Sequence, residues 1–158
     1  MAGESAGGNL AAAVSMMARD KGVKMPIYQL LVYPIAGTNM DTPSYVENAQ
    51  AKPLNKEMMG WFMEKFLRSP ADGKDPRVNL VAANLKGLPP TTILTAQIDP
   101  LRSDGEILSA KLREAGVTVD YQSYDGVTHE FFGMGAVVDK AKEAEQRAAM
   151  DLKKAFGG

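Results

Sequence analysis

Two spacings of apolar residues alternate along the chain. Residues 6–21 carry Leu10, Val14 and Met17 at helical spacing, which predicts a helix. Residues 27–33 are largely apolar, which predicts a strand buried on both faces of a sheet. The further elements predicted in this way are a helix from Asn55 to about Leu67, a strand over Thr91–Ala96, a helix from about Ser103 to Ala115, a strand over Val117–Tyr124, and a last helix with Val137, Ala141, Ala144, Ala148 and Leu152 on one face.

This order of elements predicts an α/β fold in a single domain of 158 residues. Strands that alternate with helices of ten or more residues pair in parallel through right-handed crossovers. We expect three strands, plus a stub of a fourth at residues 1–2, which are fewer than an ordinary strand contains. Residues 36–88 are too long for a plain crossover and contain their own helix. We interpret them as a partial helical cap above the carboxyl edge of the sheet, where ligands bind in such folds.

The helix predicted within this insert carries an aromatic group, Trp61, Phe62 and Phe66, with Met58 on the same stripe. We interpret this group as the apolar face that packs the helix onto the domain. The alternative is that it forms a wall of the pocket for the acyl group of a substrate.

Composition narrows the classes of function. A net charge of −1 with interspersed signs argues against a nucleic-acid partner, and no apolar run approaches the roughly 18 residues of a membrane span. The chain has no cysteine, which excludes disulfides and thiolate metal sites and fits the cytoplasm. The carboxylates of Asp41, Asp72 and Asp75 lack the spacing of a metal site, so we expect them to be solvated loop residues.

The chain opens on Gly3-Glu4-Ser5-Ala6-Gly7, which has the G-x-S-x-G pattern of a nucleophile elbow. In this motif the serine sits at a strained turn between a strand and a helix, and we expect Gly3 and Gly7 to avoid collisions there. The following helix N-terminus favours negative charge on the attacked oxygen, with the Ala6 N–H as an oxyanion donor. The pattern alone is weak evidence, because glycine-flanked serines are common in such turns.

Ser5, Asp99 and His129 follow one another in the order nucleophile, acid and base. Each lies just beyond a predicted strand or on the loop that follows one, and these strand ends share one edge of a parallel sheet. Serine needs a base to take its proton, imidazole can return that proton to a leaving alcohol, and a carboxylate orients the imidazole. Taken singly, Asp99 before Pro100 is also typical of a turn or cap, and the lone histidine is also typical of a structural residue.

Together these motifs resemble those of the hormone-sensitive-lipase-like carboxylesterases, an α/β-hydrolase family. The segments that carry the resemblance are Gly3–Ala11, Tyr33-Pro34, Leu88–Pro90, Asp99–Leu101 and Gly126–Phe131. They span essentially the whole chain but only the C-terminal half of the usual family length. The resemblance implies a partial α/β-hydrolase fold and a catalytic triad of Ser5, Asp99 and His129. It also implies hydrolysis of short- or medium-chain carboxylic esters without a metal or organic cofactor.

The sequence also departs from the family pattern. The first strands of the sheet and the His-Gly-Gly-Gly oxyanion loop precede the elbow in the family and are missing from this sequence. The Ala6 N–H is then the one remaining oxyanion donor, and losing one such donor typically costs roughly 10²–10³ in turnover. Glu4, Ser103 and Glu130 stand where the family usually has aspartate, an acidic residue and glycine.

The missing strands predict an open edge beside the strand over residues 27–33. We therefore expect a fragment of a longer esterase, or a homo-oligomer that covers this edge and its apolar surface. Two alternatives to ester hydrolysis stay open. One is an inactive truncated hydrolase that acts as a binding or self-associating module, and the other is a hydrolase of peptides or amides.

Overall fold

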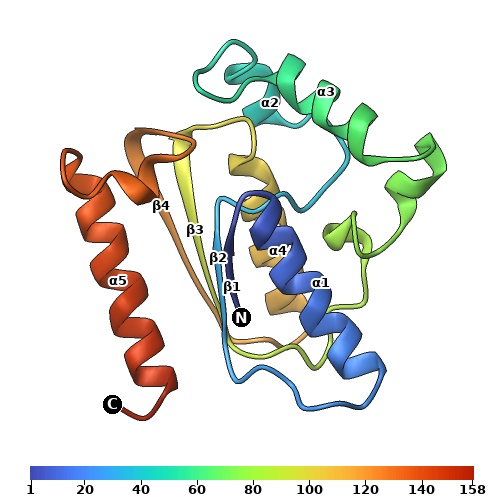
Figure 1. The fold of residues 1–158 in the computed structure, drawn as a ribbon, viewed down its shortest axis with the longest axis vertical. Coiled ribbons are helices and arrows are strands. Elements are labelled where there is room, and N and C mark those ends of the chain that lie inside the picture. The colour runs from blue at the N-terminus through green and yellow to red at the C-terminus, as the bar shows by residue number, and fades with distance from the viewer.

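A computed structural model describes residues 1–158 as three layers, with helices α1 and α4 on one face of a sheet and α5 on the other (Figure 1). The elements in chain order are β1 (Ala2–Glu4), α1 (Ala6–Asp20), β2 (Gln29–Val32), α2 (Pro43–Glu47), α3 (Lys56–Phe66), β3 (Thr91–Ile98), α4 (Arg102–Glu114), β4 (Val119–Thr128) and α5 (Asp139–Ala155), with short 3₁₀ turns at Pro70–Lys74, Leu80–Ala82 and Phe131–Met134. No helix combines the length and apolar character needed to cross a membrane.

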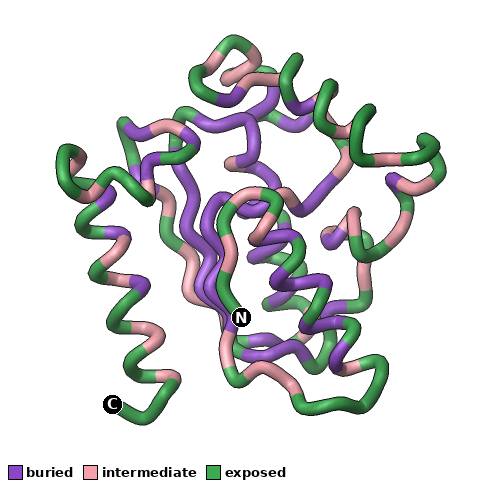
Figure 2. The backbone as a smooth tube through the Cα atoms, viewed as in Figure 1, coloured by how far each residue is buried: buried purple, intermediate pink, exposed green.

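The sheet is parallel throughout, in the order β1-β2-β3-β4, as the alternation of strands and helices predicts. Successive side chains on β2 and β3 point to opposite faces of the sheet. Leu31 and Ile93 belong to the core under α1 and α4, whereas Leu30, Val32 and Leu94 belong to the core under α5. Both central strands are therefore buried on both faces, and Figure 2 shows them as a continuous buried layer.

The first strand is more complete than the sequence suggests. The segment Ala2–Glu4 pairs with β2 over three residues, and the Met1 amino group donates to the Tyr28 carbonyl at 2.7 Å. The expected stub of a fourth strand is therefore present, although it covers Ala2–Glu4 rather than residues 1–2, and the open edge lies at β1 instead of β2. The far edge of β1 has no partner strand.

Helix α1 buries a different face from the one that its larger apolar residues predict. Leu10, Val14 and Met17 are 58, 43 and 37% exposed. The buried face instead carries small residues, chiefly Ala11 and Ala12. Alanine lets a helix approach a sheet closely, and this close packing decides which face turns inward.

The last helix packs by the predicted alanines, since Ala141, Ala144 and Ala148 are all buried against the sheet. Leu152 is only partly buried at the edge of that core. The placement of Val137 is wrong, because this residue precedes α5 and is 80% exposed in the turn that leads into the helix.

The insert lies above the carboxyl edge of the sheet, as predicted (Figure 1). Helix α3 begins at its predicted cap, where the Asn55 side chain accepts a hydrogen bond from the Met58 N–H at 2.8 Å. The short helix α2 was not predicted, because its segment has the composition of a turn. Its Tyr45 packs with Met59 of α3 and with Leu101 at the start of α4.

Candidate active site

Ser5 occupies the sharp turn between β1 and α1 with strained dihedrals, φ 52° and ψ −120°. Its N–H donates to the Val32 carbonyl at 2.9 Å. Its carbonyl accepts from the N–H groups of Gly8, Asn9 and Ile35 at 3.1–3.2 Å. Strain of this kind costs on the order of 1–3 kcal/mol and persists only where the surroundings determine the conformation, as these bonds do here.

The elbow needs glycine at two positions, but only one of them was predicted. A Cβ on Gly3 would lie 2.1 Å from the Gly7 carbonyl oxygen, so the expected crowding at Gly3 is present. The expectation for Gly7 is wrong, since a Cβ there would meet nothing within 4 Å. The second tight position is Gly8, whose Cβ would lie 2.8 Å from that of Pro34, because α1 crosses the end of β2 at this point.

The structure brings Ser5, His129 and Asp99 together at the carboxyl edge of the sheet. The Ser5 Oγ lies 3.0 Å from His129 Nε2, and His129 Nδ1 lies 2.7 Å from Asp99 Oδ2. The imidazole and carboxylate side chains are 4% and 0% exposed. A neutral imidazole has one N–H, and pairing it with the carboxylate leaves Nε2 facing the hydroxyl as an acceptor.

Asp99 also has the turn role that its place before Pro100 suggests. Its Oδ1 accepts from the Leu101 N–H at 2.8 Å while Oδ2 faces His129. The Asp99 carboxylate therefore stabilises the loop between β3 and α4 and also contacts the imidazole. Its hydrogen bond to the Leu101 N–H holds it in position for its contact with His129.

Tyr33, at the end of β2, contacts two residues of the site. Its ring centroid lies 4.4 Å from that of His129, and its hydroxyl donates to Glu4 Oε2 at 2.7 Å. Burial, reinforced by the bond to Glu4, raises the pKa of the Tyr33 hydroxyl far above its ordinary value, so it stays a donor. The sequence marked the Tyr33-Pro34 pair but not this contact, which joins the elbow to the imidazole.

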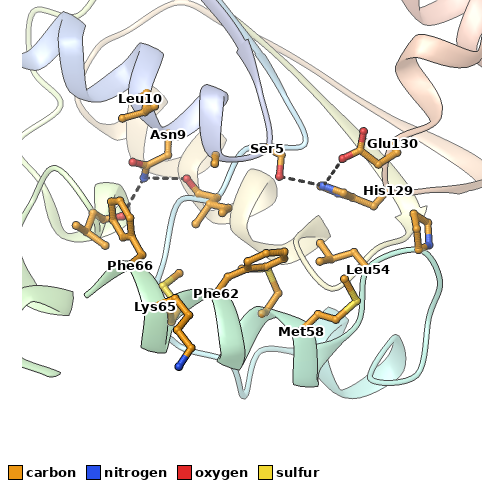
Figure 3. A pocket seen from close by; sticks show the side chains of 16 residues that line it. Ser5, Asn9, Leu10, Leu54, Met58, Phe62, Lys65, Phe66, His129 and Glu130 are labelled. Atoms are coloured by element: carbon orange, nitrogen blue, oxygen red, sulfur yellow. Dashed lines mark hydrogen bonds and ion pairs between the residues drawn. The ribbon is translucent and has the colours of Figure 1, made fainter. Parts of the chain in front are cut away.

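Glu130 has a left-handed backbone, with φ at 69°. This conformation favours glycine, which accounts for the glycine usual in the family but not for the glutamate of this chain. The Glu130 Oε1 atom lies 3.7 Å from His129 Nε2 (Figure 3). The sequence gave no reason to expect a second carboxylate beside the base.

Ser5 and His129 open into an apolar pocket with a volume of about 540 Å³. Met58, Phe62 and Phe66 of α3 form the wall opposite them (Figure 3). The residues that complete the lining are Ala6, Asn9, Leu10, Ile35, Pro53, Leu54, Met59, Met63, Lys65, Val78 and Glu130.

The interpretation of the aromatic group as a packing face is therefore wrong for Phe62 and Phe66. Both rings are exposed to the pocket, and Met59 is the residue of α3 that is fully buried. Trp61 does not line the pocket, and its side chain faces solvent. No group of histidine and carboxylate side chains is arranged to hold a metal ion.

Two buried polar groups tie the insert to the rest of the domain. The Asn9 amide donates to the carbonyls of Ile35 and Val78, both at 3.0 Å (Figure 3). Asp104 Oδ2 accepts from the N–H groups of residues 36 and 37 at 2.9 and 2.8 Å. Burial nevertheless raises the pKa of the Asp104 carboxyl to about 6.

A sequence profile described as the alpha/beta hydrolase fold matches residues 1–133. The chain belongs to this family. It is 35% identical over 161 residues to carboxylesterase NlhH of Mycobacterium tuberculosis, covering 99% of this chain and 50% of that protein. It is 40% identical over 138 residues to carboxylic ester hydrolase LipN of the same species, covering 84% of this chain and 37% of that one.

Solved structures agree with this assignment to the hydrolase family. The Pyrobaculum calidifontis esterase matches with a TM-score of 0.93 at 36% identity, over 97% of this chain and 51% of that one. A thermophilic carboxylesterase from a metagenomic library matches with a TM-score of 0.93, over 98% of this chain and 53% of that one. The resemblance to carboxylesterases and the partial α/β-hydrolase fold are thus confirmed, and the chain spans about half the length of these relatives.

Proposed function

We propose that this chain is a serine hydrolase that cleaves carboxylic esters through an acyl-enzyme on Ser5. The observation that carries the proposal is the chain of hydrogen bonds from Ser5 through His129 to the buried Asp99, at the mouth of an apolar pocket. Relatives named as carboxylesterases support the choice of an ester over a peptide or amide.

In the proposed mechanism, His129 Nε2 takes the Ser5 proton as Oγ attacks the ester carbonyl carbon. The same nitrogen then donates the proton to the alcohol oxygen as the bond between carbon and the leaving oxygen breaks. In the second half water attacks the acyl carbon and gives a proton to Nε2, which passes it to Oγ as the bond between the acyl carbon and Oγ breaks and the carboxylic acid leaves. Asp99 stabilises the imidazolium in both halves and holds the Nδ1–H tautomer.

We propose the Ala6 N–H as the oxyanion donor within this chain. It opens α1, so it has no intrahelical acceptor and lies at the positive end of the helix. Losing one such donor typically costs roughly 10²–10³-fold in turnover, so we expect this N–H to contribute strongly to the rate.

We propose that residues 36–88 act as a cap and that the pocket takes the apolar part of a short- or medium-chain ester. A volume of about 540 Å³ lies within the range of small-molecule sites. The wall formed by Phe62 and Phe66 is apolar.

Hydrolysis of p-nitrophenyl butyrate tests the proposal. We expect Ser5→Ala and His129→Ala to remove turnover above background, while Ser69→Ala, in an exposed loop, leaves it unchanged. Full turnover by Ser5→Ala would refute the role of Ser5. Absence of turnover in the unmodified chain would favour the inactive binding module.

A specific observation supports self-association as a second function. Val14 and Met17 form an exposed apolar stripe on α1 outside the pocket lining, and α1 follows the unpartnered edge strand β1. We propose that a second copy of the chain covers this surface. Val14→Lys is then expected to dissociate the assembly in sedimentation velocity, whereas Val46→Lys, at an exposed position of α2, leaves it intact. A monomeric unmodified chain would contradict the proposal.

A further inference from the structure

The pocket has one charged group at its catalytic end, the carboxylate of Glu130. The other charged lining residue is Lys65, whose ammonium bonds to Glu64 at 2.7 Å and points away from the pocket (Figure 3). The ion-pair contact of Glu130 is with His129 alone, and no lysine or arginine neutralises it. An uncompensated negative charge therefore faces an otherwise apolar cavity.

The backbone sets the direction in which the Glu130 side chain leaves the chain. Residue 130 adopts the left-handed conformation between two buried residues, His129 and Phe131. Its side chain is 57% exposed, so it keeps its hydration and stays available to a ligand. Retaining glutamate where the backbone favours glycine has a conformational cost, which a function for the carboxylate would explain.

The position of Glu130 relative to the reaction follows from His129. In the proposed mechanism Nε2 donates a proton to the leaving oxygen, so that oxygen must approach Nε2 within hydrogen-bond distance. Glu130 Oε1 lies 3.7 Å from the same nitrogen. A substituent a few bonds along the alcohol from the leaving oxygen therefore reaches the carboxylate, whereas an apolar acyl chain can extend toward Phe62 and Phe66.

We propose that Glu130 determines specificity by favouring esters whose alcohol carries a cation, such as quaternary ammonium alcohols, over neutral and anionic esters. This inference rests on the proposed function, because the same pocket and base are involved. The attraction between opposite charges operates in the bound state, so we expect it in kcat/KM and in affinity. Exposure to solvent limits the effect to about fivefold or less.

Matched thioesters test the proposal. The ratio of kcat/KM for butyrylthiocholine to that for its neutral isostere, 3,3-dimethylbutyl thiobutyrate, is measured in the unmodified chain and in Glu130→Gln. We expect the ratio to fall about fivefold in Glu130→Gln and to recover in part in Glu130→Asp. The control is Glu57→Gln, which makes the same charge change on α3 outside the lining and should leave the ratio unchanged. An equal ratio in Glu130→Gln would overturn the proposal.

A binding measurement separates this proposal from the proposed hydrolysis. Butyrylcholine and neutral 3,3-dimethylbutyl butyrate are titrated by calorimetry into Ser5→Ala and into Ser5→Ala/Glu130→Gln, in which hydrolysis through Ser5 cannot proceed. We expect the second substitution to weaken binding of butyrylcholine about fivefold and to leave the neutral ester unchanged. Equal weakening of both esters, or of neither, would overturn the role of Glu130 whether or not the unmodified chain hydrolyses esters.

Discussion

The two walls of the pocket are built by opposite means. On the sheet side, Ser5 and His129 are held by strained backbone, buried hydrogen bonds and the fully buried Asp99. On the insert side, α3 presents Phe62 and Phe66 largely to open space. Figure 2 shows the same contrast as a buried sheet edge beneath a mostly exposed helix.

This contrast follows from what each wall must do. Proton transfer requires donor and acceptor within hydrogen-bond distance, and misplacement of a reacting group by about 1 Å can cost 10²-fold in rate. A wall for an apolar chain needs only apolar surface of suitable shape, and methionine beside aromatic rings adapts easily. We therefore expect substitutions on the sheet side to affect the chemical step, and those on α3 to affect the choice of substrate.

The largest effect is expected on the sheet side, for Asp99→Asn. The amide can orient its NH₂ toward Nδ1 and stabilise the wrong tautomer of His129, so we expect kcat to fall by roughly 10⁴-fold with little change in KM. Asp41→Asn, in the exposed part of the insert, is the matched control. A loss below about tenfold would show that the buried carboxylate does not support the base.

The next effect concerns Asp104, which holds the loop where the chain leaves the sheet for the insert. Its pKa is raised from 3.8 to about 6, so the folded state binds this proton more tightly than the unfolded chain does. Stability from this group is therefore lost as the pH rises from about 4 to about 6. Asp104→Asn keeps an oxygen acceptor for the two N–H groups without the charge.

Urea unfolding at several pH values measures this effect. The unfolding free energy of Asp104→Asn minus that of the unmodified chain should increase by about 2–3 kcal/mol between pH 4 and pH 7. A difference that stays constant with pH would mean that the carboxyl titrates alike in the folded and unfolded states.

A smaller effect is expected on the insert side, where Phe62 and its neighbour Trp61 form a matched pair. Phe62→Ala removes part of the pocket wall, so kcat/KM for p-nitrophenyl octanoate should fall about tenfold while that for the acetate changes little. Trp61→Ala removes a larger ring from the same helix that lies outside the lining but packs edge-on against Phe62, and it should change both values less than Phe62→Ala does. Equal losses of kcat/KM for the two esters would mean that Phe62 supports folding and does not determine the choice of substrate.

The smallest effect concerns the start of α3. Asn55→Ala removes the cap on the Met58 N–H, which should destabilise the helix by about 1 kcal/mol. Faster hydrogen exchange in the first turn of α3, with unchanged kcat for p-nitrophenyl acetate, is the expected result. Asn55→Asp keeps an acceptor and should behave like the unmodified chain. Slow hydrogen exchange in both variants would mean that packing alone fixes the start of α3.

The parts of the fold that follow from local pattern could be predicted from the sequence. Strand and helix order, the cap at Asn55 and the alanine face of α5 all depend on residues close in the chain. The buried face of α1 could not, because Leu10 and Val14 look like core residues until the close fit of the alanines against the sheet is known.

For the site, the motif and the order of strand ends were enough to select Ser5, Asp99 and His129, whose roles stay predictions. The contacts of Tyr33 with Glu4 and His129 could not be predicted, since they depend on how the end of β2 lies against the elbow. Glu130 was visible only as a departure from the family pattern, and its distance from Nε2 required coordinates.

The most direct test of the central claim is labelling of the unmodified chain with a fluorophosphonate, followed by peptide mapping. An activated hydroxyl attacks such a probe and retains it covalently. We predict one adduct, on Ser5, formed at least about 10³-fold faster than in His129→Ala. An unlabelled Ser5, or equal labelling rates in the two proteins, would contradict the claim that the imidazole activates this serine.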